Sequence, residues 1–363
     1  MPVESHADRQ VRLPDEFSTR LLVRRTLWVV ALLGVIALIA AFAPGLGEVR
    51  GYLKDAAGGW IAVAVVLEFL SGVSYVAMFR PVFCMRASWR TSWEIGWSEL
   101  AVGSIVPASG ASGLALGAWI LAQGGMPADK IARRSVAFFL VKSSVNFVAV
   151  AVIGTAMALG LFGPHRSLLL TAVPAALSIA TIGIVVLIAR LGRGSDAPED
   201  AGKVRRAFVA ARRAVIDGAG EAIRIVRAGN VLVIAGAFGY WAFDNAVLWA
   251  TFRAFGVSVP LSVILMGYLI GQLGGLLPLP GGVGGIDGGL IGTLIVFGAP
   301  AAATAAAVLV YRVILFWLPL IVGGLAFVSL RRGLNQPDRP DLCHPLPGGP
   351  AIPTVTLPQR GNV

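Results

Sequence analysis

Eight apolar stretches, separated by short polar connections, run along this chain of 363 residues. They cover approximately residues 27–43, 60–79, 95–122, 135–161, 168–190, 229–255, 261–298 and 302–329. Most are close to the ~20 residues that a helix needs to cross a bilayer, or longer. The pattern therefore predicts an all-α fold, that of a polytopic integral membrane protein.

Two of these stretches are interrupted by glycine and proline. Residues 107–117 read PASGASGLALG, and residues 274–289 read GGLLPLPGGVGGIDGG. Lipid offers no hydrogen bonds to loose backbone, so irregular chain at this depth must be buried in protein or line a cavity. Broken helices of this kind mark the binding sites of many transporters, and the two breaks are candidates for such a site.

The charged connections predict the topology. Arginine and lysine gather in 80–94, 123–134 and 190–228, which the positive-inside rule places in the cytoplasm. If 95–122 crossed the membrane once, the basic connections on its two sides would lie on opposite faces. A re-entrant hairpin that turns at Pro107 resolves this conflict, and the same reasoning makes 261–298 a second hairpin, entered from outside. We therefore expect six crossing helices, two re-entrant helical hairpins, and cytoplasmic N- and C-termini.

The two breaks also match each other in register. Gly103, Pro107, Gly110, Gly113 and Gly117 correspond to Gly274, Pro278, Gly281, Gly284 and Gly288 at a constant offset of 171. Because one hairpin enters from each side, this correspondence predicts an inverted repeat, over about 60–161 and 229–329. Chance matching in a chain with 45 glycines is the alternative.

Composition supports the membrane class and excludes others. Hydrophobic residues make up 56% of the chain and charged residues 13%, with a mean hydropathy of +0.79. The net charge of +11 lies in short loops, which indicates topology and not nucleic-acid binding. We expect a cytoplasmic segment at 1–26, a transmembrane domain at 27–332 with a basic linker at 191–228, and a disordered Pro/Gly-rich tail at 333–363. Within the linker, the apolar stripe of 203–227 is typical of an interfacial helix on anionic lipid or of a basic linker that fixes topology.

The start of each hairpin's second helix is a candidate anion site. These starts are predicted near 109–112 and 285–287. Helix N-termini carry unpaired N–H groups and partial positive charge, so two of them meeting inside the membrane would attract an anion. Ser109 and Ser112 would then bind a phosphate oxygen, or are plain helix caps.

Ionisable residues inside the apolar stretches are the second set of candidates. Lys142 and Arg312 lie at matching positions of the two repeats, and a charge at the bilayer centre costs about 2.5–3.5 kcal/mol on insertion scales. They either bind the substrate or pair with Glu68, Asp244 or Asp287 to hold the bundle together. Asp287 repels an anion when ionised and admits one when protonated, which gives a hypothesis of proton coupling.

The sequence motifs of several enzyme classes are missing. There is no GxxxxGK[S/T] phosphate loop, no HExxH and no Cys/His cluster. His6, His165 and His344 lie in the N-terminal segment, an expected external loop and the tail, and Cys84 and Cys343 are far apart. We therefore expect no catalytic residue, no metal and no cofactor.

The stretch LLPLPGGVGGIDGGLIGTLIVFGAPAAATAAAVLVYRVILFWLPLIVGG resembles the signature of the lysylphosphatidylglycerol synthase transmembrane family, and the resemblance extends over approximately residues 20–332. It implies a stand-alone flippase-like protein. In fused bacterial relatives this region is described as moving aminoacylated phosphatidylglycerol between leaflets, while a separate soluble domain makes it. The family pattern carries over as site positions Pro278, Pro280, Gly281, Gly282, Asp287 and Arg312.

Two departures from the family pattern leave the substrate open. The acidic position is usually Glu and here is Asp287, and PASGASGLALG has no charged residue where relatives often have one. An aminoacyl lipid is therefore one candidate beside polyprenyl-phosphate sugars and other anionic lipids. We expect no soluble transferase domain, since nothing after Arg332 reads as globular.

These observations predict a flippase-like transporter that moves a lipid or lipid-linked anionic substrate across the plasma membrane of a bacterium. Its partners would be membrane lipids, with no nucleic acid; the oligomeric state is open. The candidate substrate-binding residues are Pro107, Ser109, Ser112, Lys142, Pro278, Pro280, Gly281, Gly282, Asp287 and Arg312, with Glu68 and Asp244 as candidate charge partners.

Two alternatives stand beside this prediction. One is a membrane-embedded transferase that uses a polyprenyl-phosphate donor, with Asp244 or Asp287 as base. The other is a non-catalytic accessory subunit of an envelope-synthesis complex. An enzyme is expected to hold its acidic residues near one face of the membrane, whereas a transporter is expected to hold them near mid-depth.

Overall fold

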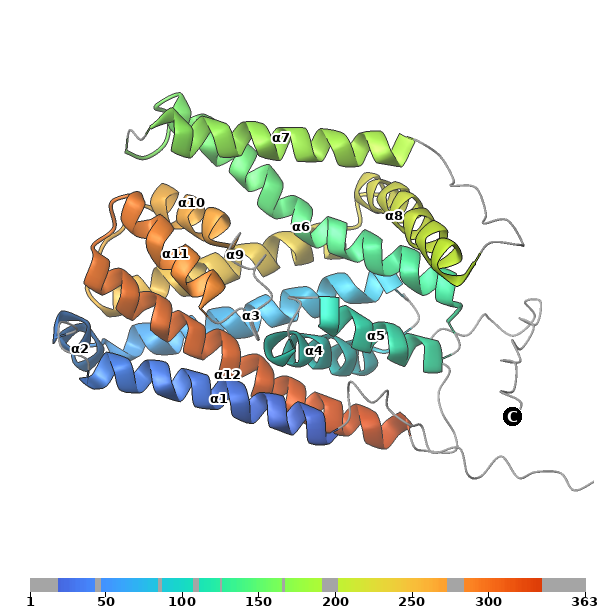
Figure 1. Ribbon diagram of the computed structural model, residues 1–363, viewed down its shortest axis with the longest axis horizontal. Coiled ribbons are helices and arrows are strands. Elements are labelled where there is room, and N and C mark those ends of the chain that lie inside the picture. The colour runs from blue at the N-terminus through green and yellow to red at the C-terminus, as the bar shows by residue number, and fades with distance from the viewer. Residues whose placement is uncertain are drawn as a thin grey trace, which may run out of the picture.

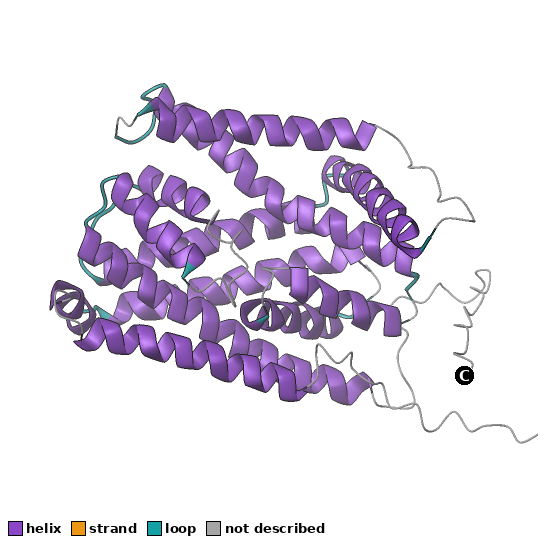
Figure 2. Ribbon diagram, viewed as in Figure 1, coloured by secondary structure: helices purple, strands orange, loops and turns teal. Residues whose placement is uncertain are grey.

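The computed structural model describes residues 19–42, 47–83, 87–106, 111–124, 126–164, 167–190, 202–272 and 284–334. Their regular structure is helical throughout (Figures 1 and 2). The helices are α1 (Thr19–Phe42), α2 (Gly47–Lys54), α3 (Gly58–Phe83), α4 (Trp89–Ile105), α5 (Ala111–Gln123), α6 (Ala128–Ala158), α7 (Leu168–Arg190), α8 (Lys203–Arg227), α9 (Val231–Ala254), α10 (Leu261–Gly271), α11 (Gly285–Val296) and α12 (Ala301–Leu334).

This confirms the prediction of an all-α polytopic membrane protein. Within the described residues, α3, α6, α7, α9 and α12 are each long and apolar enough to cross a membrane. α1 covers the first predicted stretch. The connection between the first two apolar stretches contains the short helix α2. Val49 of α2 is buried and Tyr52 packs edge-on against Phe255, so tertiary contacts hold this short helix.

α3 and α9 form the centre of the bundle and run antiparallel along their full length. At one end the N–H of Ala57 donates to the carbonyl of Ala254 (2.8 Å). Near the middle the Ser71 hydroxyl donates to the carbonyl of Tyr240 (3.1 Å). Figure 1 shows the two helices side by side with opposite chain directions.

The order of helices repeats around this pair. α3, α4, α5 and α6 are followed, after α7 and α8, by α9, α10, α11 and α12 with similar relative lengths and spacing. α3 and α9 are equivalent in the two sets, and their antiparallel packing is the relation that an inverted repeat requires. The helix order therefore extends the repeat beyond the glycine and proline matches.

Each set contains a packed pair of short helices. α4 packs against α5 and α10 against α11, and Figure 1 shows the two pairs toward opposite ends of the bundle. In the second pair a Cβ on Gly271 would lie 2.7 Å from Cα of Leu290, so glycine permits the close approach. The breaks themselves, 107–110 and 273–283, lie outside the described residues. Re-entry of the hairpins from the two membrane faces stays a prediction.

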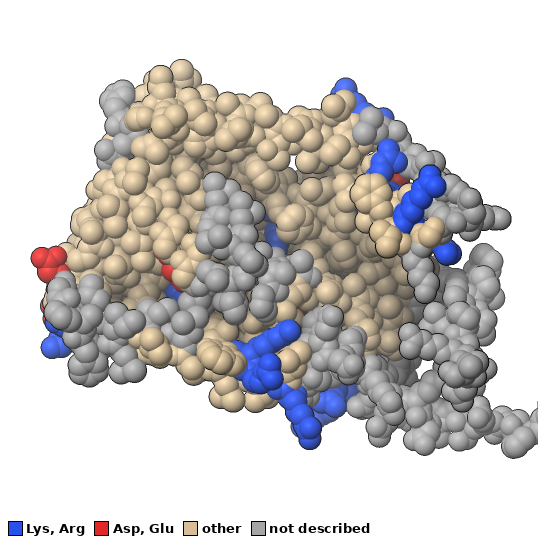
Figure 3. All heavy atoms as spheres, viewed as in Figure 1, with Lys and Arg blue, Asp and Glu red and all other residues tan. Residues whose placement is uncertain are grey.

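α7 and α8 cover α6 on the side away from α9 (Figure 1). The second half of α8 packs onto the protein, where Ala219 and Ala222 are buried, and Glu221 forms an ion pair with Arg134 of α6 (3.0 Å). The first half exposes Phe208 and several arginines. Figure 3 shows Lys and Arg gathered at this end of the molecule, as the predicted topology requires; its cytoplasmic location stays a prediction.

Close packing of α12 on α4 gives a test of the fold. A Cβ on Gly323 would meet the carbonyl oxygen of Trp97 and lie 2.6 Å from Cβ of Ala101, whereas a Cβ on Gly324 would meet nothing within 4 Å. We expect Gly323→Ala to lower the stability by ~1–3 kcal/mol through overpacking. Gly324→Ala should leave it unchanged or raise it by up to about 1 kcal/mol, since alanine favours helix. Thermal unfolding in detergent, followed by tryptophan fluorescence, measures both; equal midpoints for the two variants would contradict this packing.

Candidate functional site

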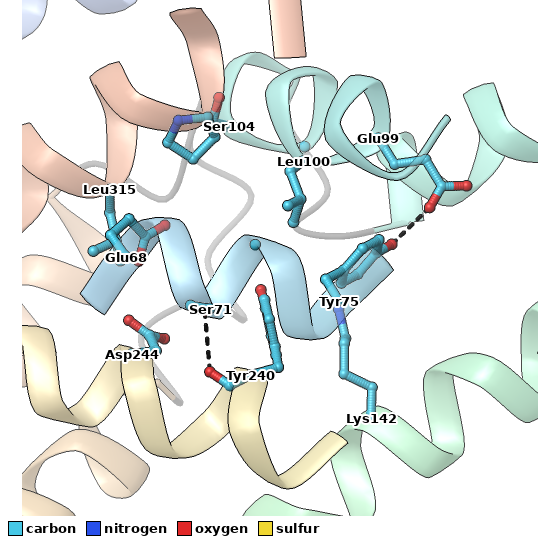
Figure 4. Close-up of a pocket in the computed structure, with 13 residues that line it drawn as sticks. Glu68, Ser71, Tyr75, Glu99, Leu100, Ser104, Lys142, Tyr240, Asp244 and Leu315 are labelled. Atoms are coloured by element: carbon cyan, nitrogen blue, oxygen red, sulfur yellow. Dashed lines mark hydrogen bonds between the residues drawn. The ribbon is translucent and has the colours of Figure 1, made fainter. Parts of the chain in front are cut away.

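A cavity of about 170 Å³ lies in the middle of the bundle, between α3, α4, α6, α9 and α12 (Figure 4). Its lining contains both apolar side chains and several ionisable ones. The residues that line it are Glu68, Ser71, Gly72, Tyr75, Glu99, Leu100, Gly103, Ser104, Lys142, Tyr240, Asp244, Leu315 and Pro319. Three carboxyl groups and one ammonium group therefore face one small space, contributed by both repeats.

The ionisable residues of the cavity lie near the middle of their helices. Glu68 and Asp244 occupy central positions of α3 and α9. Lys142 lies midway along the 31 residues of α6, which at 1.5 Å per residue puts it roughly 20 Å from either end. A charged group at that depth is costly and is kept only with a partner or a function.

Glu99 is held at one end of the cavity by Tyr75. The Tyr75 hydroxyl donates to Oε2 of Glu99 (2.7 Å), and both side chains are buried. The other carboxyl oxygen, Oε1, is buried and has no hydrogen-bond partner among the described residues. The carboxyl group lies over Gly117 of α5, and the backbone carbonyl of Glu99 lies over Gly113, so a Cβ at either glycine would collide with Glu99. Two of the repeat glycines thus make room for this residue, one for its acidic side chain and one for its backbone.

Asp244 has a tyrosine on each of its carboxyl oxygens. Tyr268 of α10 donates to Oδ2 (2.5 Å) and Tyr311 of α12 donates to Oδ1 (2.7 Å). Glu68 lies beside Asp244 at the end of the cavity opposite Glu99 (Figure 4). Its Oε2 is buried and accepts no hydrogen bond from the part of the chain that the structure describes.

The two halves of the repeat share one kind of contact, a buried hydrogen bond between a tyrosine and a carboxyl group. Tyr75 of α3 donates to Glu99 of α4, and Tyr268 of α10 donates to Asp244 of α9, each across 24 residues. The first two helices of each half are therefore joined by a buried tyrosine–carboxyl bond, with donor and acceptor exchanged between the halves. A neutral donor satisfies a carboxyl group in the membrane without adding a charge.

Lys142 lies between the aromatic rings of the two central helices. Its Nζ is 5.6 Å from the ring centroid of Tyr75 and 5.5 Å from that of Tyr240. Among the described residues no carboxylate is within salt-bridge distance of Nζ, although Glu99 is close enough to interact electrostatically. The ammonium group is thus held by aromatic faces and faces the cavity.

Arg312 lies outside the cavity lining and pairs with Asp287. The Nε of Arg312 is 2.5 Å from Oδ1 of Asp287, and both side chains are largely buried. The other oxygen of Asp287 accepts from the N–H of Gly284 (3.0 Å) and caps the start of α11. Of the two uses considered for Arg312, the observed contact is the ion pair.

Of the other predicted site residues, one is described by the structure and the rest lie outside the described residues. Ser112 is described and buried in the first turn of α5, and its Oγ has no partner among the described residues. Pro107, Ser109, Pro278, Pro280, Gly281 and Gly282 lie outside the described residues. The described parts of α5 and α11 begin at Ala111 and Gly285, where the second helix of each hairpin was expected to begin. The predicted anion site between them stays a prediction.

Sequence reasoning missed Glu99 and the tyrosines. Glu99 lies eight residues before the first break, in a stretch where only the glycines and prolines entered the prediction. A single tyrosine in an apolar helix does not indicate a site. The sequence signal for these tyrosines was that, in each half, one lies 24 residues from a carboxyl residue. Over the described ranges, no group of three or more His, Cys, Asp or Glu residues is placed to hold a metal ion.

The fold and this cavity define a polytopic helical membrane protein with a polar, ionisable centre between two repeated halves. Residues 27–323 match the model of the lysylphosphatidylglycerol synthase TM region, and the chain belongs to that family. A UPF0104 membrane protein of Methanothermobacter thermautotrophicus is 26% identical over 327 residues, 81% of this chain and 93% of the relative. Two shorter matches to proteins of the same description and organism are 34% identical over 86 residues and 37% over 93, each about a quarter of both chains. The resemblance found in the sequence is confirmed.

The Asp287–Arg312 pair is open to a double-mutant test. Arg312→Leu leaves a largely buried carboxylate without its cation, and we expect a loss of stability of up to about 3–5 kcal/mol. Asp287→Asn removes the unpaired charge and keeps a capping oxygen, so Asp287→Asn/Arg312→Leu should be more stable than Arg312→Leu alone. Thermal unfolding in detergent decides; a double variant no more stable than Arg312→Leu would contradict a structural role for the pair.

Proposed function

We propose that this protein moves an anionic lipid, or a lipid-linked anionic substrate, between the leaflets of the membrane. The single observation that carries the proposal is the ionisable cavity in the middle of the bundle, lined by helices of both repeated halves. Paired halves around a central polar site are the architecture of alternating access, in which the site opens to one side and then to the other.

Lys142 is the group best suited to meet the lipid head group. It is a cation on the cavity wall whose ammonium is held by the rings of Tyr75 and Tyr240 and not by a salt bridge to a described carboxylate. A phosphate entering the cavity would gain a charge-assisted hydrogen bond without first breaking an ion pair.

The depth of the acidic residues favours transport over a transferase. Glu68 and Asp244 lie near the middle of their helices and not near an end. Both oxygens of Asp244 already accept tyrosine hydroxyls, and Asp287 is paired with Arg312. A general base needs a free carboxylate within reach of the acceptor, so neither residue is well placed for that role.

Leaflet exchange in proteoliposomes tests this function. The purified chain is reconstituted with trace fluorescent phosphatidylglycerol in one set of vesicles and a fluorescent polyprenyl phosphate in another, and a membrane-impermeant quencher reports the exposed label. We expect exchange of at least one of them. Lys142→Ala should slow it by about tenfold or more, equivalent to ~1.4 kcal/mol of barrier. Lys142→Arg, which keeps the charge, should retain most of it, and Lys54→Ala on exposed α2 is the matched control.

The outcomes test the transporter against an accessory subunit. No exchange of any anionic lipid by folded protein would reject the proposal. Exchange that survives Lys142→Ala unchanged would reject the role of Lys142. An accessory subunit predicts that charge-removing variants at Lys142 and Arg312 retain full function in cells, provided that the protein still inserts.

A further inference from the structure

We propose that Glu68 is a proton-binding site that couples lipid movement to a proton gradient, an inference that rests on the proposed lipid translocation. Glu68 would then supply the link between lipid movement and its energy source. It lies in the cavity and is far along the chain from Asp287, the acidic position of the family pattern.

The cavity has too many acidic groups to receive an anion while all are ionised. Glu68, Glu99 and Asp244 face it, against the single ammonium of Lys142. Fully ionised, the lining carries a net negative charge and repels a phosphate, and the low dielectric of the interior strengthens the repulsion. A proton on one or two of these carboxyls brings the lining to neutrality or close to it. Proton binding therefore admits the anion, and proton release expels it.

Two of the three carboxyls are stabilised as anions by their neighbours. Asp244 accepts hydroxyl donors on both oxygens. Glu99 accepts one from Tyr75 and lies near the ammonium of Lys142. Hydrogen bonds to a carboxylate and a nearby cation both favour its charged form.

Glu68 has neither kind of support on its buried oxygen. Its residue is 7% exposed, and Oε2 accepts no hydrogen bond from the described residues. Its nearest charged neighbour is Asp244, a second carboxyl, and like charges side by side disfavour ionisation of both. Of the three groups, Glu68 is the one that gains most from a proton.

The other titratable groups around Glu68 come from α4, α6, α9 and α12, which pack against α3, and from α10, which packs against α9. They are Asp244 and Tyr240 from α9, Glu99 from α4, Lys142 from α6, Tyr268 from α10, and Tyr311 and Arg312 from α12. The two cations in this set are held elsewhere, Lys142 against tyrosine rings and Arg312 by Asp287. Among the ion pairs of the described residues, none joins Glu68 to a cation.

The geometry favours a proton over a metal cation. A bound Na⁺ or divalent ion needs several oxygen ligands together. Both oxygens of Asp244 are already occupied by tyrosine hydroxyls, which leaves Glu68 as one carboxyl beside them. No acidic cluster in the described part of the chain is arranged for a metal. A proton requires only an unpartnered oxygen, and Oε2 of Glu68 is one, on a carboxyl group that accepts no tyrosine hydroxyl from the described residues.

Transport driven by a pH gradient tests the proposal. Proteoliposomes are prepared with the lipid that the wild-type chain exchanges, and the membrane potential is clamped with valinomycin and K⁺. With one proton per lipid, a gradient of about one pH unit should produce up to ~10-fold enrichment of the lipid in one leaflet. Glu68→Gln should exchange lipid without enrichment, because the neutral side chain mimics the protonated state. Glu68→Asp should keep the enrichment, and Glu48→Gln on α2 is the control outside the cavity.

A second measurement reads the proton directly and does not depend on transport. Infrared difference spectra of the detergent-solubilised protein, recorded across a pH titration in H₂O and D₂O, detect the C=O stretch of a protonated carboxyl. We expect a titrating band in wild type and Glu48→Gln that is missing from Glu68→Gln.

The two measurements have separate failures. Enrichment that persists in Glu68→Gln, replacement of the pH gradient by a Na⁺ gradient without loss of enrichment, or an unchanged infrared band in Glu68→Gln would each overturn the proton site. If the wild-type chain exchanges no lipid while the Glu68 band is present, the proposed function fails and proton binding at Glu68 stands.

Discussion

The antiparallel packing of α3 against α9 is the constraint on which the rest of the structure depends. It joins the equivalent first helices of the two halves and puts Glu68 beside Asp244 and Tyr75 near Tyr240. Because these helices run in opposite directions, the short helix pairs that follow them lie toward opposite ends of the bundle (Figure 1). The cavity forms where both halves meet, so its position in the middle of the bundle follows from the antiparallel arrangement.

Carboxyl groups lie in the interior of the bundle, where burying a charge is costly. Two of them have neutral tyrosine partners. Glu99 and Asp244 each bond a tyrosine 24 residues away, in mirrored order, and Lys142 is held by aromatic faces. Such contacts hold charged groups without neutralising them, in contrast to the Asp287–Arg312 ion pair at the start of α11. The cavity thus keeps groups able to change charge, while the paired charges stabilise a helix start.

Hydrophobic length and glycine spacing predicted most of the fold. The long apolar stretches are helices, and the helices after the breaks begin at Ala111 and Gly285 in the described chain. The constant offset of 171 between the two breaks predicted the repeated order of helices. What the sequence could not show was set by contacts between distant segments. α2 is held by packing against Phe255, and Glu99 is a cavity residue because it lies over glycines of α5. The partner of Arg312 was open among three carboxyl residues, since helix rotation and packing decide which one lies within reach.

The central claim is that one cavity, built by both halves, is reached from both sides of the membrane. Ser104 lines it, and cysteine is close to serine in size, so Ser104→Cys in a chain whose Cys84 and Cys343 are replaced by serine is a direct probe. A membrane-impermeant maleimide is added to intact cells and, separately, to inside-out vesicles. We expect labelling of Ser104→Cys from both sides. The rate of labelling should rise under conditions that promote lipid exchange. Labelling from one side alone, under every condition in which lipid is exchanged, would contradict it.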